Sequence, residues 1–243
     1  MKTLVATTAI FVCTSFAVSA TPITFFGENL TPNAMVSGDP VTARDEFLAN
    51  LEGGFGTEDF ESGGLTLTFP GSTGDIEAIL SGGSTGIESS SGLGRFATSG
   101  SNFVETGEGG DFNIAFNTAI SAFGFFATDI GDFGNSLGLR LTLEGGGTVD
   151  LDVPNTVGSD GDTDGALLFF GFVDTEDTYT NISFFNDPTG DDVFGFDDLI
   201  VGDAGQVIAI PDPQPNPVPL PASILLLGTA LAGFGATRRK KAV

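Results

Sequence analysis

The chain has 243 residues, of which 32 are Asp or Glu, eight are Lys or Arg and none is His. Without His, and with Cys13 as its one thiol, it lacks the side chains for a Ser-His-Asp triad, a Cys-His dyad or the His- and Cys-rich coordination that zinc favours. A nucleic-acid-binding face needs clustered Lys and Arg, so no nucleic acid is expected as a partner.

Residues 1–20 have the pattern of a secretory signal peptide. Lys2 provides a positive start, an apolar run extends to Phe16, and small residues end at Ala20, where we expect cleavage. The alternative is a first membrane helix, but the apolar run is shorter than the ~20 residues that cross a bilayer. We therefore expect an exported protein that loses Cys13 with its signal peptide.

The next region, residues 21–209, is expected to form one domain that is both acidic and rich in apolar residues. All 32 carboxylates lie between residues 21 and 217 with three arginines and no lysine, a formal net charge of −29. An acidic surface keeps an exported protein soluble, and the same stretch contains 21 Phe. So many aromatic residues predict a folded core rather than a disordered acidic segment, and the length fits one β domain.

One short helix is expected near the start of this domain, over residues 39–51. Asp39 is placed to cap it, Pro40 suits the first turn, and Gly53 and Gly54 end it.

Most other apolar residues alternate with polar ones, which is the period of a strand. Strands are expected at 65–69, 112–116, 121–128, 137–143, 149–153, 167–173, 179–185 and 193–201. The sequence Glu-Gly-Gly-Gly at 144–147 predicts a hairpin turn, and residues 167–170 are apolar on both faces, as in a strand between two layers. The Ser- and Gly-rich segment 81–110 predicts a long loop or weak edge strands. The expected fold class is all-β, an antiparallel β-sandwich of the jelly-roll type.

Asp160, Asp162 and Asp164 stand at alternate positions before Gly165, like the first half of an EF-hand-type calcium loop. Ca²⁺ is the one cofactor that we expect. The match ends at Gly171, where the closing Glu of such a loop would stand, so another ligand must come from elsewhere. The alternative is a polar turn whose Asp side chains accept hydrogen bonds from its own backbone.

Asp197 and Asp198 form a second candidate metal site, within the predicted strand 193–201. Alternation places Asp198 on the face of Phe196 and Ile200 and Asp197 on the opposite face, so one carboxylate points inward in either case. Burying an unpaired ionised carboxylate costs several kcal/mol, and three arginines cannot pair with 32 acids. The alternatives are a bound cation, backbone N–H donors, or a strand that ends early and leaves both side chains in water.

The C-terminal segment begins with a Pro-rich linker, residues 210–217, which we expect to be extended and stiff. Residues 218–223 form a compact motif that contains Val218, Pro219, Leu220, Pro221 and Ala222. A membrane helix is expected over residues 222–237 as a transient anchor in the inner membrane, because its apolar part is short and contains glycine. A basic stop then holds the end of the chain in the cytoplasm, and it consists of Arg238, Arg239, Lys240 and Lys241.

Residues 218–243 closely resemble a PEP-CTERM sorting signal of the VPLPA type. The resemblance implies a Gram-negative bacterium with an exosortase-type membrane enzyme that recognises residues 218–222 and processes the tail. Such proteins are delivered to the cell surface or to the extracellular matrix of a biofilm. Some catalogues label this tail after the C-terminus of ice-binding proteins, which concerns the tail and no activity. The alternative is an ordinary single-pass anchor.

The body of the chain resembles uncharacterised β domains that precede such tails, through residues 122–129 and 194–199. This resemblance implies a sandwich and no reaction. A resemblance to jelly-roll carbohydrate-binding modules, which often hold a structural calcium, favours a cation at Asp197 and Asp198.

Together, these features predict a non-enzymatic cell-surface or matrix protein, either an adhesin or a structural module associated with extracellular polysaccharide. Stacking on sugars has little support in the composition, because the chain has no Trp and Tyr179 is its one Tyr. One alternative is a glycosidase, since two carboxylates suffice for that chemistry. Another is an ice-binding protein, although no Thr repeat is visible.

Overall fold

The computed structural model describes residues 21–208, except 83–84, 93, 107–111, 132–135, 156–164 and 188–192. The chain divides into two compact units, residues 1–208 and 209–243, and every described residue belongs to the first. The predicted signal peptide, the aspartates at 160–164 and the sorting tail therefore lie outside the described residues. Among the described helices, none is long and apolar enough to cross a membrane.

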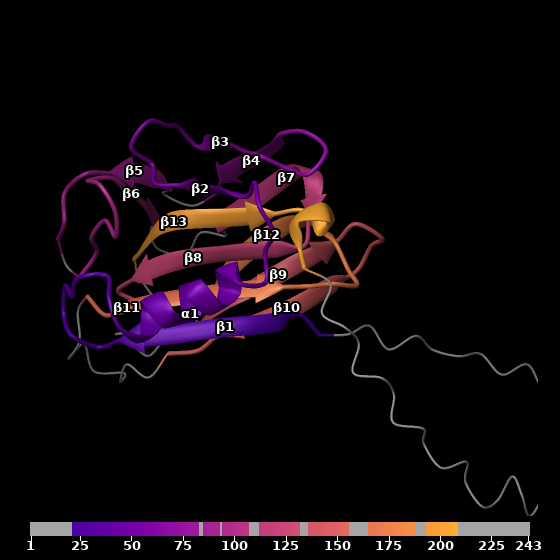
Figure 1. Cartoon of the computed structure of the whole chain (residues 1–243). Helices are drawn as coiled ribbons and strands as arrows, with labels where there is room; N and C mark the ends of the chain where they lie inside the picture. Colours follow the sequence, from indigo (N-terminus) through magenta and orange to yellow (C-terminus); the bar gives the residue numbers. More distant parts are fainter. Residues whose placement is uncertain are drawn as a thin grey trace, which may run out of the picture. The chain divides into compact units, whose positions relative to one another are not determined.

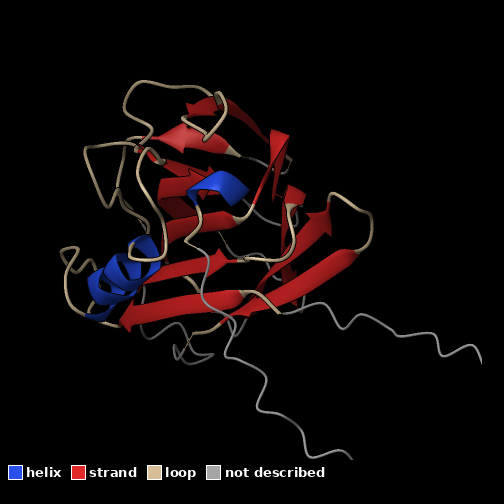
Figure 2. Cartoon of the chain, turned by 45° about the vertical axis from the view of Figure 1, so that its right-hand side comes forward, coloured by secondary structure: helices blue, strands red, loops and turns tan. Residues whose placement is uncertain are grey.

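The described strands form two antiparallel sheets that pack against each other, and the one described α-helix lies on the outer face of the seven-stranded sheet (Figures 1 and 2). The seven-stranded sheet contains β1 (Ile23–Asn29), β11 (Leu167–Val173), β8 (Ala122–Thr128), β13 (Phe194–Gly202), β6 (Phe103–Thr106) and β5 (Gly86–Glu88) in that order, with β2 (Gly56–Glu58) paired to β13. The six-stranded sheet contains β10 (Thr148–Val153), β9 (Ser136–Leu143), β12 (Tyr179–Asp187), β7 (Phe112–Ile120), β4 (Ile76–Ser81) and β3 (Thr66–Phe69).

Strands β6 to β13 follow the strand order of a jelly roll. Within the first sheet the order is β6-β13-β8-β11, and within the second it is β7-β12-β9-β10. Strands β1, β2 and β5 extend the first sheet, and β3 and β4 extend the second. The predicted antiparallel sandwich is confirmed, and its central strands have the predicted topology.

The core between the two sheets consists largely of phenylalanine. The ring centroids of Phe112 and Phe184 lie 4.8 Å apart, and those of Phe184 and Phe196 lie 5.1 Å apart, distances at which aromatic rings attract one another. All three side chains are at most 3% exposed. Burial of each contributes about 1.5–3 kcal/mol, which helps to offset the self-repulsion of the acidic surface.

A second apolar layer lies on the outer face of the seven-stranded sheet, under helix α1 (Asp39–Leu48) (Figure 1). The ring of Phe47 on α1 lies 5.7 Å from that of Phe169 on β11. A Cβ atom at Gly171 would lie 2.9 Å from the Phe47 ring, so glycine allows this close approach. Residues 167–170 are apolar on both faces because one face looks into the sandwich and the other meets α1, which confirms the prediction.

The helix and several strands differ from the sequence-based expectation. Helix α1 ends at Leu48 rather than at residue 51. Gly38 is its N-cap without a side-chain hydrogen bond, and Asp39 is already helical, so the predicted capping role of Asp39 is wrong.

Strands β1, β2 and β4 were not expected, whereas segment 81–110 contains β5 and β6 as short strands.

Candidate functional site

Asp197 and Asp198 lie on β13 at a β-bulge. The register with β8 shifts between Asp197 and Ile200, and Asp198 has a positive φ of 50°. Because the bulge interrupts the alternation, Phe196 and Leu199 both join the core between the sheets while Ile200 joins the layer under α1. The predicted face of Ile200 is therefore wrong. Asp197, next to the inward-facing Phe196, points to the outer side of the sheet and is only 1% exposed.

Asp197 is held by a loop over the sheet that we call the strap, residues 94–102. Its Oδ2 accepts hydrogen bonds from the backbone N–H groups of Thr98 (2.7 Å) and Ser99 (3.0 Å) and from the Thr98 hydroxyl (3.1 Å). The Thr98 hydroxyl shares its one hydrogen between Asp197 and the nearer Asp198 Oδ2 (2.8 Å), and the Ser99 hydroxyl donates to Asp198 Oδ1 at 2.9 Å. Among the alternatives open from the sequence, backbone donors account for the buried carboxylate.

Other carboxylates hold the rest of the strap. Glu61 accepts hydrogen bonds from the backbone N–H groups of Ser101 and Asn102, both at 2.6 Å. At the other end, Arg95 donates to Glu105 at 2.7 Å and lies 3.7 Å from a carboxylate oxygen of the buried Asp129. The acidic residues thus serve as acceptors for loop backbone, which explains how a domain with three arginines accommodates buried acids.

Burial raises the pKa of Asp197 to about 7, and the nearby charge of Asp198 acts in the same direction. The hydrogen bonds from the backbone of Ser99, Asp198 and Thr98 oppose this rise. The raised pKa means that ionising Asp197 at this position costs free energy, because the strap keeps its carboxyl group away from solvent.

The bonding of Asp197 and Asp198 bears on the predicted metal site. Three oxygen atoms of this pair already accept strap donors, and the remaining oxygen of Asp197 accepts the N–H of Asp198 at 2.8 Å. Within the described ranges, no group of three or more acidic, His or Cys side chains is arranged to hold a metal ion. Calcium remains a prediction, and the loop at 160–164 that motivates it lies outside those ranges.

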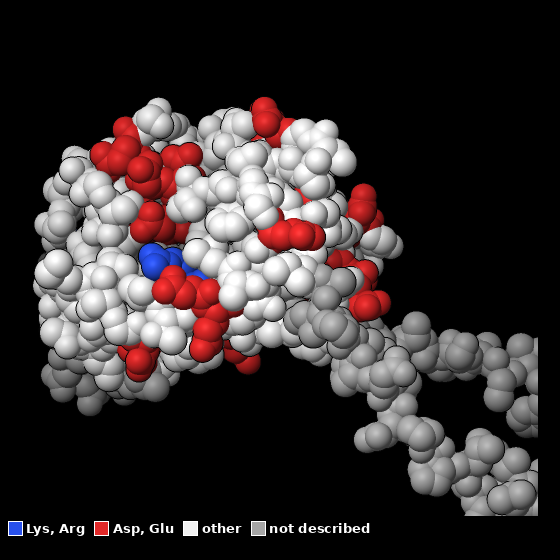
Figure 3. Space-filling model, in the orientation of Figure 1, with Lys and Arg blue, Asp and Glu red and all other residues white. Residues whose placement is uncertain are grey.

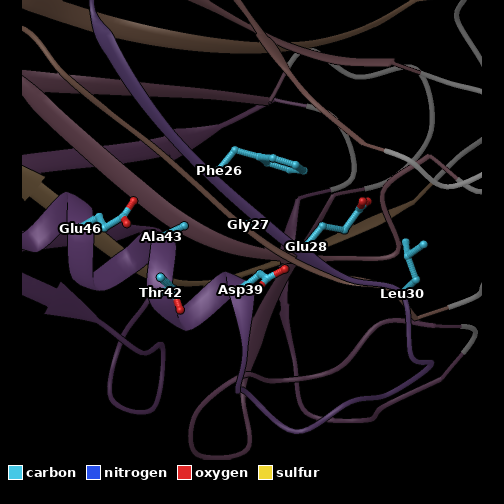
Figure 4. Close-up of a pocket in the computed structure, with 8 residues that line it drawn as sticks. All are labelled: Phe26, Gly27, Glu28, Leu30, Asp39, Thr42, Ala43 and Glu46. Atoms are coloured by element: carbon cyan, nitrogen blue, oxygen red, sulfur yellow. The ribbon is translucent and has the colours of Figure 1, made fainter.

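A groove of about 480 Å³ runs between β1 and the first turns of α1 (Figure 4). Asp39, Thr42 and Glu46 line it from the helix, while Phe26 and Glu28 lie on the side of β1 turned away from the helix. β1 ends its sheet, and so the groove follows a strand edge. Because Asp39 and Glu46 on the helix and Glu28 on β1 all line it, the groove suits a polar or cationic ligand better than an anion.

A smaller hollow of about 380 Å³ lies between residues 33–36 and residues 96–98 of the strap. Met35 on its rim is 86% exposed. The hollow shows that the strap also forms part of the molecular surface.

Acidic side chains are spread in several groups over the face shown in Figure 3, and basic atoms occupy only a small area of it. The carboxylates on this face lie at the molecular surface in contact with water, where they add to its negative charge.

The outer face of the six-stranded sheet has a different character. Its partly or fully exposed side chains along the middle strands β7, β12 and β9 are mainly amides and hydroxyls, with one guanidinium, one aromatic ring and one methyl group: Asn113, Ala115, Asn117, Asn181, Ser183, Phe185, Arg140 and Thr142. Exposed carboxylates on this face include Glu77 on β4 and Asp150 and Asp152 on β10, and none lies within residues 113–117, 138–142 or 181–185 of the middle strands. This face is the described surface best suited to an uncharged, hydroxyl-rich partner.

Residues 217–240 match the family model of the PEP-CTERM protein-sorting motif. The chain carries a PEP-CTERM motif. The match covers the predicted motif at 218–222 and most of the predicted tail, and it confirms the resemblance described above. A PEP-CTERM motif implies export, processing by an exosortase, and delivery to the cell surface or the extracellular space.

Solved structures with some similarity to the body of this PEP-CTERM chain share 14–17% of its sequence. They include the C-terminal family 22 carbohydrate-binding module of Clostridium thermocellum Xyn10B (16% identity, 64% of this chain, 98% of that chain, TM-score 0.35). The K2 cleaved adhesin domain of Lys-gingipain is a second (17% identity, 60% of this chain, 97% of that chain, TM-score 0.36). At such low TM-scores the likeness carries no information about a ligand. No curated protein sequence matches the chain.

Proposed function

We propose that this PEP-CTERM chain is a non-enzymatic component of the cell surface or extracellular matrix, an adhesin or a polysaccharide-associated structural module. The observation that carries the proposal is the sorting motif at 217–240. The domain ahead of it is a sandwich with two apolar layers, a rigid architecture that suits a structural or adhesive role.

The described carboxylates favour a binding role over the glycosidase alternative. Glycosidases need an acid with a raised pKa beside an open substrate site. Burial raises the pKa of two described carboxylates, Asp197 and Glu58. Asp197 is 1% exposed beneath the strap and cannot reach a substrate there, and neither residue lines the groove beside α1 or the hollow beside the strap.

The charge of the domain restricts the matrix partner. With a formal net charge of −29 between residues 21 and 217, an anionic polysaccharide would be repelled unless divalent cations bridge the two. The proposal includes Ca²⁺ at Asp160, Asp162 and Asp164 as one such bridge. A neutral polysaccharide needs no bridge.

The test is fractionation of cells that produce the full chain, following its size and compartment by immunoblot. The variant Pro219→Ala/Pro221→Ala alters the motif, and Pro213→Ala/Pro215→Ala is the matched control in the linker. We expect the wild type and the control to yield a shortened product outside the inner membrane, and the motif variant to accumulate as an unprocessed membrane precursor. Normal processing and release of the motif variant would refute the proposal.

A further inference from the structure

We propose that the outer face of the six-stranded sheet binds a neutral polysaccharide chain, with Phe185 as the platform on which a sugar ring packs. This inference deepens the proposed function, on which it rests, by naming the partner class and the surface that receives it.

The first observation concerns consecutive phenylalanines. In a strand, two neighbouring residues point to opposite faces, so a Phe-Phe pair places one ring on each side of its sheet. The pairs 25–26, 125–126 and 169–170 lie on β1, β8 and β11, the strands that α1 contacts, and their outer rings join the layer beneath the helix. The pair Phe184–Phe185 lies instead on β12, in the six-stranded sheet, whereas α1 packs against β1, β11 and β8 of the other sheet.

Phe185 therefore carries an outward-facing ring without a helix over it. Phe184 is 3% exposed in the core, whereas Phe185 is partly exposed on the opposite face. The other exposed apolar side chains of this face include Ile79 on β4 and Ala115 on β7, and the ring of Phe185 adds an aromatic surface on which the apolar side of a partner can pack.

The ring of Phe185 lies across Gly138, its partner on the neighbouring strand β9. A Cβ atom at Gly138 would overlap the ring, so the ring can lie across this position of β9 only because the residue there is glycine. The guanidinium carbon of Arg140 lies 5.2 Å from the ring centroid. Arg140 is in turn fixed by two hydrogen bonds to Asp150, of 2.8 and 2.7 Å. The ring is thus held by its neighbours before any ligand arrives, which reduces the entropy that binding would cost.

Hydrogen-bonding groups surround this ring in register. Ser183 stands opposite Asn113 on β7 and opposite Arg140 on β9. Asn181, two residues along the same strand, stands opposite Thr142. Amides, hydroxyls and a guanidinium offer both donors and acceptors to sugar hydroxyls, while the C–H face of a sugar ring packs on the phenyl ring.

The charges of this sheet face and of the whole domain favour a neutral polysaccharide over a charged one. Over residues 113–117, 181–185 and 138–142 of the middle strands, Arg140 is the one charged outward side chain, and Asp150 forms an ion pair with it. A cationic partner finds few carboxylates here, and an anionic one meets the net negative charge of the domain.

The experiment is affinity electrophoresis of the exported protein in gels that contain a neutral polysaccharide (β-glucan, xylan, galactomannan or starch) or anionic alginate, with chelator present. We expect retardation by at least one neutral polysaccharide and none by alginate. Phe185→Leu keeps an apolar side chain over Gly138 but removes the flat ring, and should weaken binding about tenfold. Phe185→Tyr should retain binding, and Glu46→Gln, in the groove beside α1, is the matched control that should behave as the wild type.

Unfolding is separated from loss of binding by the melting temperature of each variant, which should match the wild type for Phe185→Leu. Equal retardation of the wild type and Phe185→Leu, or no retardation by any neutral polysaccharide, would overturn the inference. A concentration-dependent dimer that Phe185→Leu abolishes, in the absence of glycan binding, would assign the face to self-association and also overturn it. Either result leaves the processing experiment unaffected, so failure of the glycan surface and failure of the sorting proposal are distinguishable.

Discussion

Thr98 and Asp197, 99 residues apart in the chain, are joined by two hydrogen bonds, from the Thr98 backbone N–H at 2.7 Å and from its hydroxyl at 3.1 Å. Through them the strap covers a carboxylate that β13 would otherwise expose on the outer face of the sheet. Since the pKa of Asp197 is raised to about 7 by burial, this contact also links the stability of the domain to pH.

The linkage predicts a loss of stability as pH rises. In the unfolded chain Asp197 ionises near pH 4, whereas in the folded domain it holds its proton up to about pH 7. The free energy of unfolding that protonated Asp197 contributes is therefore fully present below about pH 4. It declines between pH 4 and 7 at up to about 1.4 kcal/mol per pH unit, and above about pH 7 it is lost. Chemical denaturation of the wild type and Asp197→Asn across this range measures it, because the variant should lack this component of the slope.

The control for that prediction is Asp75→Asn, which removes the same charge from an exposed position. It should keep the wild-type slope between pH 4 and 7. If Asp197→Asn and Asp75→Asn show the same pH profile, Asp197 titrates normally and the prediction is wrong.

A second prediction concerns the packing of α1 on β1. A Cβ atom at Gly27 would overlap the backbone carbonyl of Asp39, which cannot rotate away as a side chain would. Gly27→Ala should therefore destabilise the domain by about 1–3 kcal/mol, as overpacking does, in urea denaturation. Gly53→Ala is the matched control, since nothing lies within 4 Å of its added Cβ. Equal stability of the two variants would show that α1 can shift without cost.

Much of the sandwich could be predicted because most strands have one apolar and one polar face. Residues 137–143 and 149–153 alternate clearly, and the structure pairs them as the expected hairpin, β9 with β10. β1 has no such pattern, since Phe25 packs under α1 while Phe26 packs against the core between the sheets. Its role depends on a helix whose position local periodicity does not reveal.

The candidate sites were less accessible to sequence reasoning. The bulge at Asp197 depends on the strap, and no local pattern near residue 197 predicts hydrogen bonds to Thr98 and Ser99. Phe185 was missed because its importance depends on register with Gly138, 47 positions earlier in the chain. The Phe-Phe pair at 184–185 was the available signal, because one of its rings must face outward.

A third prediction concerns Tyr179, which is fully buried and not available to stack on a sugar. Its hydroxyl donates to Asp174 at 2.6 Å, and Asp174 also accepts the backbone N–H groups of Glu176 and Asp177. Tyr179→Phe keeps the ring but removes one donor from a buried carboxylate, which should cost about 1–3 kcal/mol of unfolding free energy. Thermal denaturation measures this, with the exposed hydroxyl variant Thr148→Val as the control. An unchanged melting temperature for Tyr179→Phe would mean that the two backbone donors suffice.

The fourth prediction distinguishes the two sets of aspartates first considered as calcium ligands. If Ca²⁺ binds at residues 160–164, EDTA should lower the melting temperature of the wild type, and added Ca²⁺ should restore it, because a ligand that binds only the folded state stabilises it. Asp162→Asn should remove this response. Asp198→Asn should retain it, since both carboxylate oxygens of Asp198 accept hydroxyl donors from the strap rather than a cation. Loss of the response in Asp198→Asn alone would place the ion at the bulge of β13, and a wild type insensitive to EDTA would exclude calcium from the stability of the domain.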